Sequence, residues 1–160
     1  MKKGPSFLVT LIVGLAALFV AAGVYAASTV PDVIKMDNPA YKAHKKGIVE
    51  FSHKKHVDEY GASCGECHHD DKGKPLDLKA GDDVQGCIAC HKIPGEVPKD
   101  VKKEWKAKKL KKAEKNKLEL EYHAEAMHGN CKGCHKAFNK KNKTKKAPTT
   151  CAKCHPKLKK

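Results

Sequence analysis

Cysteine and histidine are the residues of this chain whose spacing points most directly to chemistry. The pattern Cys-x-x-Cys-His occurs four times, at residues 64–68, 87–91, 131–135 and 151–155, named here the first to the fourth motif. Two cysteines three residues apart lie about one helical turn from each other, so both sulfurs can bond to the two vinyl groups of one porphyrin. The histidine that follows directly is then able to ligate the porphyrin iron.

The motifs therefore predict four covalently attached c-type haems. The expected attachment residues are Cys64, Cys67, Cys87, Cys90, Cys131, Cys134, Cys151 and Cys154, and the expected iron ligands from the motifs are His68, His91, His135 and His155. These are all eight cysteines of the chain. Zinc sites and disulfides also use paired cysteines. Neither of them explains a histidine after every pair, so the pattern favours haem.

The remaining histidines indicate a second ligand for each iron. Six lie outside the motifs: His44, His53, His56, His69, His123 and His128. Four irons with two axial histidines each would need four of these six. His68 and His69 are adjacent, so their side chains must diverge. If each binds a different iron, one peptide unit ties two haems together at a fixed angle.

The order of these residues resembles a known family. Phe-x-His-x-x-His at 51–56, then Cys-x-x-Cys-His-His at 64–69 and three further haem motifs, is similar to the class III tetrahaem cytochromes c (the cytochrome c-three type) of sulfate-reducing bacteria. The resemblance covers roughly residues 33–155. It implies that the second ligands at the first, second, third and fourth motifs are His53, His69, His56 and His128 respectively.

Two of these histidines compete for the fourth motif. His128 precedes Cys131 by three residues, a compact spacing that favours it, but the imidazole of His123 is chemically able to ligate as well. Met127 beside His128 could in principle be an axial ligand, and packing is its expected role. His44 lies among lysines and is expected to be an exposed surface histidine.

The N-terminus predicts export. Residues 1–26 read as a signal peptide, with Lys2 and Lys3 before an apolar stretch and Val24-Tyr25-Ala26 as the cleavage site. The apolar stretch just reaches membrane-spanning length, so an uncleaved anchor is the alternative. In either case residues 27–160 are expected to form one exported tetrahaem domain.

The predicted fold class is a small single domain that is mainly α, with much irregular loop and the haem cluster as its core. A short N-terminal β-hairpin is expected from residues 34–36 and 48–51, and a long helix over 99–128, with Pro98 at its start and Gly129 at its stop. Apolar residues are scarce after the N-terminus. The haems would therefore supply much of the core, and the chain without haem is not expected to fold.

The charge of the chain predicts an acidic partner. All 33 basic residues are lysine and the formal net charge is +15, although four haems would add about eight carboxylates. Lysines concentrate in residues 99–117 and 136–146. The first block is either a solvated helix face or a docking surface. Nucleic acid is not expected as a partner of an exported protein; an acidic protein surface is.

Together these features predict a periplasmic, low-potential electron carrier of sulfate respiration rather than an enzyme, because two histidines on each iron leave no open position for a substrate. The resemblance implies acidic redox partners such as a periplasmic hydrogenase or formate dehydrogenase, and a membrane-bound cytochrome complex. Two alternatives remain. One is a terminal reductase of metal ions or oxyanions at a five-coordinate haem. The other is an anchored haem subunit of a larger redox complex.

Overall fold

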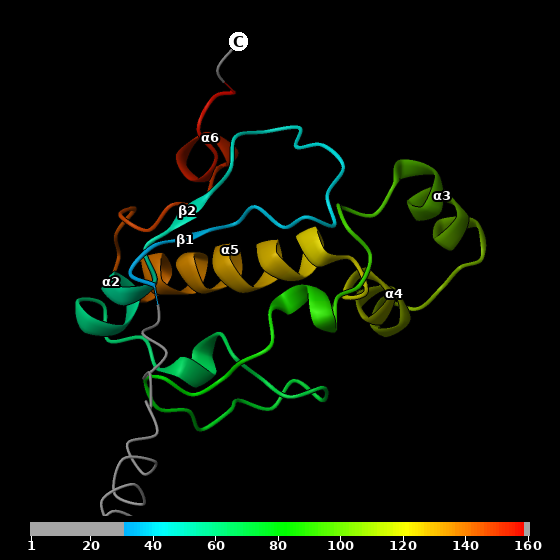
Figure 1. Ribbon diagram of the computed structural model, residues 1–160. Helices are drawn as coiled ribbons and strands as arrows, with labels where there is room; N and C mark the ends of the chain where they lie inside the picture. Colours follow the sequence, from blue (N-terminus) through cyan, green and yellow to red (C-terminus); the bar gives the residue numbers. More distant parts are fainter. Residues whose placement is uncertain (1–30, 159–160) are drawn as a thin grey trace, which may run out of the picture.

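The computed structural model of the protein describes residues 31–158, so the signal segment predicted at 1–26 lies outside the described residues. Short helices and long loops surround one long helix, α5 (Figure 1). The elements in chain order are β1 (Ile34–Lys35), β2 (Glu50–Phe51), α2 (His53–Asp58), the 3-10 turns η1 (Cys64–Glu66) and η2 (Cys87–Ala89), α3 (Lys99–Ala107), α4 (Lys112–Glu119), α5 (His123–Lys141) and α6 (Cys151–Cys154). This confirms the predicted class, mainly helix and loop with an N-terminal hairpin.

The hairpin fixes the start of the ligand-bearing segment. Its strands are antiparallel, with Ile34 opposite Phe51. The amide of Met36 extends the pairing by donating to the Val49 carbonyl at 2.9 Å. Helix α2 begins two residues after β2, and its Lys54 amide donates to the Asp32 carbonyl at 3.2 Å. The hairpin therefore holds the N-terminal end of α2 in place.

The predicted long helix over 99–128 is wrong in extent, because three helices occupy this region. The first starts after Pro98, as expected, and is followed by Lys109 in the left-handed conformation (φ 51°) that commonly ends a helix. A second break precedes α5. There the His123 amide donates to the Ile93 carbonyl at 2.8 Å, so extended backbone pairs with a distant segment and interrupts the helix.

The helix stop predicted at Gly129 is also wrong. Helix α5 continues from His123 to Lys141 and carries the third motif within it. Glycine in a helix interior costs about 1 kcal/mol relative to alanine, which neighbouring turns can offset. The C-terminal loop consequently begins after Lys141.

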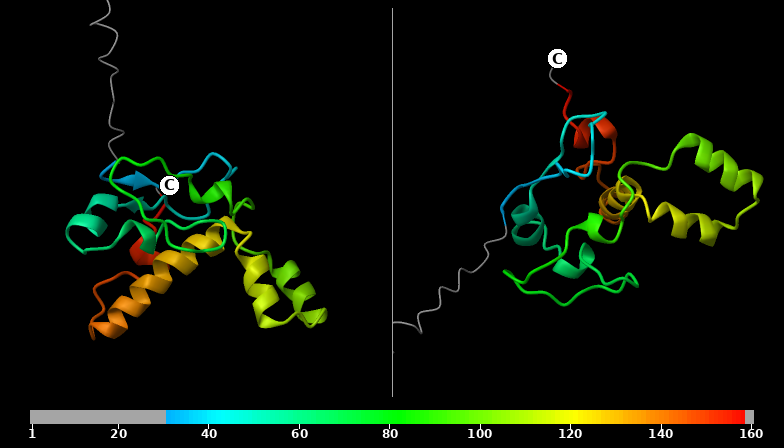
Figure 2. Two further views of the ribbon diagram at one scale, coloured as in Figure 1. Left: turned by 90° about the horizontal axis from the view of Figure 1, so that it is seen from below. Right: turned by 45° about the vertical axis from the view of Figure 1, so that its right-hand side comes forward.

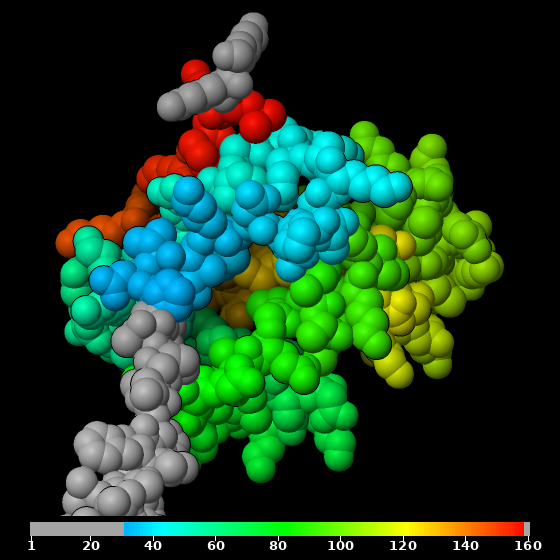
Figure 3. Space-filling model, in the orientation of Figure 1, coloured from blue at the N-terminus to red at the C-terminus, as the bar shows by residue number. Residues whose placement is uncertain are grey.

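The described residues have almost no protein core of their own. Val97, 5% exposed, is the single buried hydrophobic side chain among residues 31–158. The molecular surface is hollowed between the N-terminal segment and the segment around the second motif, with α5 at the bottom of the hollow (Figure 3). The apolar contacts that normally hold a domain together are therefore scarce here.

Within residues 31–158, every helix is too short or too polar to cross a bilayer. The anchor considered for the N-terminus lies outside this range.

Candidate haem-binding site

All four motifs adopt the same local turn. The amide of the histidine donates to the carbonyl of the first cysteine at 2.8 Å in the first motif, 2.9 Å in the second and 2.7 Å in the fourth. The third motif lies inside α5, where the same bond belongs to the helix. This turn brings the two sulfurs and the imidazole of each motif to one side of the backbone.

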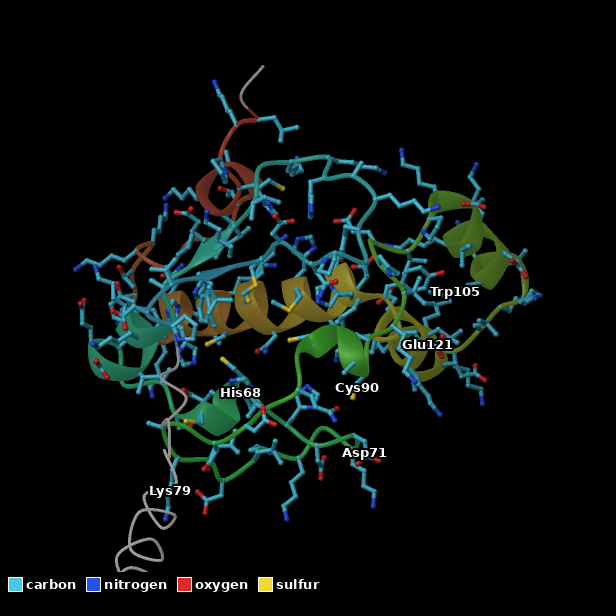
Figure 4. All side chains as sticks on the ribbon, viewed as in Figure 1. His68, Asp71, Lys79, Cys90, Trp105 and Glu121 are labelled. Carbon is cyan, nitrogen blue, oxygen red and sulfur yellow. The ribbon has the colours of Figure 1, made fainter. Side chains whose placement is uncertain are left out.

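The thiols of the four motifs gather around a common interior. All eight are free, and sulfur atoms lie along α5 and on the segments beneath it that carry His68 and Cys90 (Figure 4). Burial raises the pKa of the Cys131 thiol to about 11, and Cys67, Cys87 and Cys154 add to the rise. These neighbours come from the other three motifs, so the attachment points of all four converge.

The zinc alternative finds no support in this arrangement. Among the described residues, no three His, Cys, Asp or Glu side chains converge in the way that a directly bound metal ion requires. Burial also raises the pKa of the Cys67 and Cys87 thiols.

Each motif histidine faces one histidine from outside the motifs. Their ring centroids are 6.4 Å apart for His53 and His68, 6.0 Å for His69 and His91, 6.1 Å for His56 and His135, and 6.2 Å for His128 and His155. These are the four pairs that the family resemblance implies. No motif histidine shares its partner with another.

The spacing of the pairs fits an iron between two imidazoles. A metal–imidazole nitrogen bond is about 2.0 Å and the ring centroid lies roughly 1.1 Å behind the nitrogen, so two rings on opposite sides of one ion are about 6.2 Å apart. All four observed separations agree with this value to within a few tenths of an ångström.

Hydrogen bonds orient five of these imidazoles. The Nδ1 atoms of His56, His69, His135 and His155 lie 2.8, 2.7, 2.7 and 3.0 Å from the carbonyl oxygens of Ser52, Asp70, Pro148 and Gly47, and His91 Nδ1 bonds to the Leu120 carbonyl. A proton on Nδ1 that is donated to a carbonyl leaves Nε2 free to bind metal. Three of the five acceptors lie far away in sequence, and the sequence carries no signal that identifies them.

The two candidates for the fourth motif have different surroundings. His128 faces His155, and its Nδ1 lies 3.4 Å from Glu96 Oε1. His123 instead bonds through Nδ1 to the Tyr41 hydroxyl at 2.8 Å, and its ring contact is with Tyr41 rather than with a motif histidine. Burial lowers the pKa of His123, which therefore stays neutral at pH 7. The geometry favours His128.

The expectation that His44 is exposed is wrong. Its side chain is half-buried, stacks on Tyr41 with ring centroids 5.4 Å apart, and lies 3.1 Å from Asp37 Oδ1. Tyr41 thus contacts His44 and His123, the two histidines whose ring contact is with Tyr41 rather than with a motif histidine.

The C-terminal lysine block is attached to the third motif. Asn139 holds Ala147 from both sides, donating to its carbonyl at 2.8 Å and accepting from its amide at 3.1 Å. This clamp fixes the neighbouring Pro148, whose carbonyl orients His135. Lys143, Lys145 and Lys146 therefore lie on a loop that supports His135, and Lys140 and Lys141 lie on the last turn of α5 that leads into it.

Gly47 is a site residue that sequence reasoning missed, and it provides a test. A Cβ at this position would lie 2.3 Å from the Pro156 carbonyl oxygen, so Gly47→Ala must displace the loop segment whose carbonyl orients His155. We expect a loss of about 1–3 kcal/mol in stability, typical of overpacking, and a changed spectrum and potential of the haem at the fourth motif alone. NMR of the haem methyl groups measures this.

Gly86→Ala is the matched control, because its Cβ would meet nothing within 4 Å and its backbone (φ −66°, ψ 149°) suits alanine. Equal effects from both variants, or an unchanged fourth haem in Gly47→Ala, would contradict the role assigned to Gly47.

Four c-type attachment motifs, each with a second histidine facing its own, define the class of multihaem c-type cytochromes. The model of the class III cytochrome c family matches residues 30–155. The chain is also 31% identical over 121 residues to cytochrome c3 of Desulfovibrio desulfuricans, an alignment that covers 74% of this chain and 88% of that protein. The chain belongs to the class III cytochrome c family, whose members are multihaem electron carriers. No solved structure matches the chain significantly.

Proposed function

We propose that this protein is a periplasmic electron carrier that binds four haem c groups, each with two axial histidines. The observation that carries the proposal is the set of four histidine pairs, with ring centroids 6.0 to 6.4 Å apart, and one motif histidine in each. When bound, each haem would supply an iron that accepts and releases one electron. The eight motif cysteines would hold the porphyrins covalently.

The chain links the four sites in a defined order. His68 and His69 are adjacent. His68 faces His53 at the first motif, and His69 faces His91 of the second motif. His53 and His56 share α2 and face the first and third motifs, and α5 carries both the third motif and His128. The order of direct linkage is therefore second, first, third, fourth. Sites held this rigidly suit rapid exchange of electrons among them.

Two imidazoles on every iron would keep all four potentials low, because no thioether takes part to raise them. The same ligation leaves no open coordination position, which favours an electron carrier over the terminal reductase of metal ions or oxyanions. We also propose that the electron donor is an acidic redox protein. The family resemblance suggests a periplasmic hydrogenase or formate dehydrogenase as this donor, and a membrane-bound cytochrome complex as the electron acceptor.

We expect the mature protein to begin at Ala27, to carry four haem increments of mass, and to be low-spin when oxidised and when reduced. Intact-mass spectrometry and EPR measure these properties together. A mass with three haems or fewer would exclude the four-haem proposal, whereas a retained N-terminal segment would exclude only the freely diffusing carrier. A high-spin signal from the native protein would favour the reductase.

A further inference from the structure

Helices α3 and α4 form a hairpin that extends away from the rest of the protein (Figures 1 and 2). Its residues 99–119 are called here the lysine arm. The arm contains none of the cysteines and histidines of the four sites. Its role is therefore not explained by haem binding.

The two ends of the lysine arm meet at its base. Ile93 and Tyr122 form a parallel bridge, and the Ala124 amide donates to the Gly95 carbonyl at 3.1 Å. Glu125 closes the junction, with its Oε1 2.8 Å from Lys102 Nζ and 3.3 Å from the Val97 amide. Burial alone would raise the pKa of Glu125, but these bonds outweigh it and lower the pKa, so the carboxylate is charged at neutral pH. The arm is therefore an insertion whose two ends are held together at its base.

The outer surface of the lysine arm presents lysine without large apolar side chains. Its large apolar residues Val101, Trp105, Leu110 and Leu118 are all half-buried. The arm has ten lysines, and only two of these ten, Lys102 and Lys108, form ion pairs with described residues. Eight ammonium groups are thus free of carboxylate partners, and all of these except that of Lys115 belong to exposed residues.

The base of the arm touches the second motif. Leu120 directly follows α4, and its carbonyl accepts the Nδ1 proton of His91. The other lysine block, at residues 136–146, is attached to the third motif through Pro148. The two positive surfaces therefore belong to different haem sites.

We propose that the lysine arm docks the acidic face of a partner redox protein beside the second motif, so that electrons are exchanged there. This inference rests on the proposed electron-carrier function and names the surface that serves it. Clustered, unpaired lysines steer an acidic surface into contact at a rate that depends on salt. Insertion into a membrane would need exposed apolar side chains beside the lysines, and the arm has none that are exposed and large.

The test uses the haem-loaded protein and photoreduced flavodoxin, a strongly acidic redox protein, as the probe. In the arm variant, Lys103, Lys106, Lys109, Lys112 and Lys117 are changed to glutamine. In the matched control, Lys140, Lys141, Lys143, Lys145 and Lys146 are changed, which removes the same charge from the other block. At low salt the arm variant should be reduced roughly tenfold more slowly than the native protein, within the range of steering effects. The control should lose less than twofold.

Raising the salt concentration should remove the difference, because screening acts over about 8 Å at physiological ionic strength. Zero-length carbodiimide cross-linking should join flavodoxin carboxylates to lysines of the arm. Equal slowing by both variants, or unchanged rates in the arm variant, would overturn the proposal. Tighter binding of the haem-loaded protein to vesicles of anionic phosphatidylglycerol than to flavodoxin would also overturn the proposal.

A second variant replaces residues 99–119 with Gly-Ser-Gly and keeps the paired base. It should take up four electrons from the small neutral deazaflavin radical at the native rate, and react with flavodoxin as slowly as the arm variant. Native flavodoxin rates in this deletion would also overturn the docking role. Failure to take up four electrons from deazaflavin in the native protein would instead count against the proposed electron-carrier function.

Discussion

His69→Met is expected to raise the reduction potential of one haem, the haem attached at Cys87 and Cys90, by roughly 0.2 V, within the span of about 0.8 V that axial ligands produce. His69 faces His91 at 6.0 Å, so the substitution would exchange one imidazole of that pair for a thioether. Potentiometric titration followed by NMR, which resolves the haems individually, measures the shift. Smaller changes are expected at the first motif, because His68 is the adjacent residue.

His123→Met is the matched control. His123 bonds to the Tyr41 hydroxyl and its ring contact is with Tyr41 rather than with a motif histidine, so no haem should acquire a thioether ligand. A large rise at any motif other than the second would show that the histidine pairing is incorrect. A large rise in the control would assign His123 to an iron and remove His128 from the fourth site.

The second large effect is expected when haem is withheld. A chain produced without haem attachment should lose all of its free energy of unfolding, which is about 5–15 kcal/mol for a typical domain. The physical reason is that Val97 is the one buried hydrophobic side chain among residues 31–158, too little to offset the entropy of ordering the chain. Circular dichroism on heating and amide hydrogen exchange measure the loss.

A graded control distinguishes loss of haem from loss of cysteine. Cys151→Ala with Cys154→Ala removes only the fourth attachment point, in the short α6, and should leave a cooperative transition at lower temperature. A cooperative transition in the haem-free chain would show that the polypeptide has a sufficient core of its own.

The sequence predicted the residues that carry the chemistry of the site better than the backbone groups that hold those residues in place. The motifs can be recognised in the sequence because the cysteines and the histidine of each must occupy fixed neighbouring positions. The four histidine partners came from the resemblance, since nothing local links His56 to His135, which are far apart in the chain. The carbonyl acceptors of Gly47, Leu120 and Pro148 could not be predicted, because backbone groups are the same in every residue and only the fold selects them.

The fold was predictable where signals are local. The start of α3 follows from Pro98, and the hairpin was expected at residues 34–36 and 48–51; both are confirmed. The long helix over 99–128 failed because Ile93 pairs with Tyr122, a contact between distant segments that competes with helical hydrogen bonds. The left-handed residue between α3 and α4 is a lysine, Lys109, rather than the glycine that would have indicated a turn.

The two ends of the lysine arm pair with each other at its base, and this has a consequence for how such proteins diversify. Because residues 93–95 and 121–124 pair directly, residues 99–119 can lengthen, shorten or be exchanged while Leu120, whose carbonyl holds His91, stays in place. The distance in sequence between the second and third motifs is therefore a poor guide to kinship. Natural selection can use this interval to acquire new recognition surfaces while the redox centre stays unchanged.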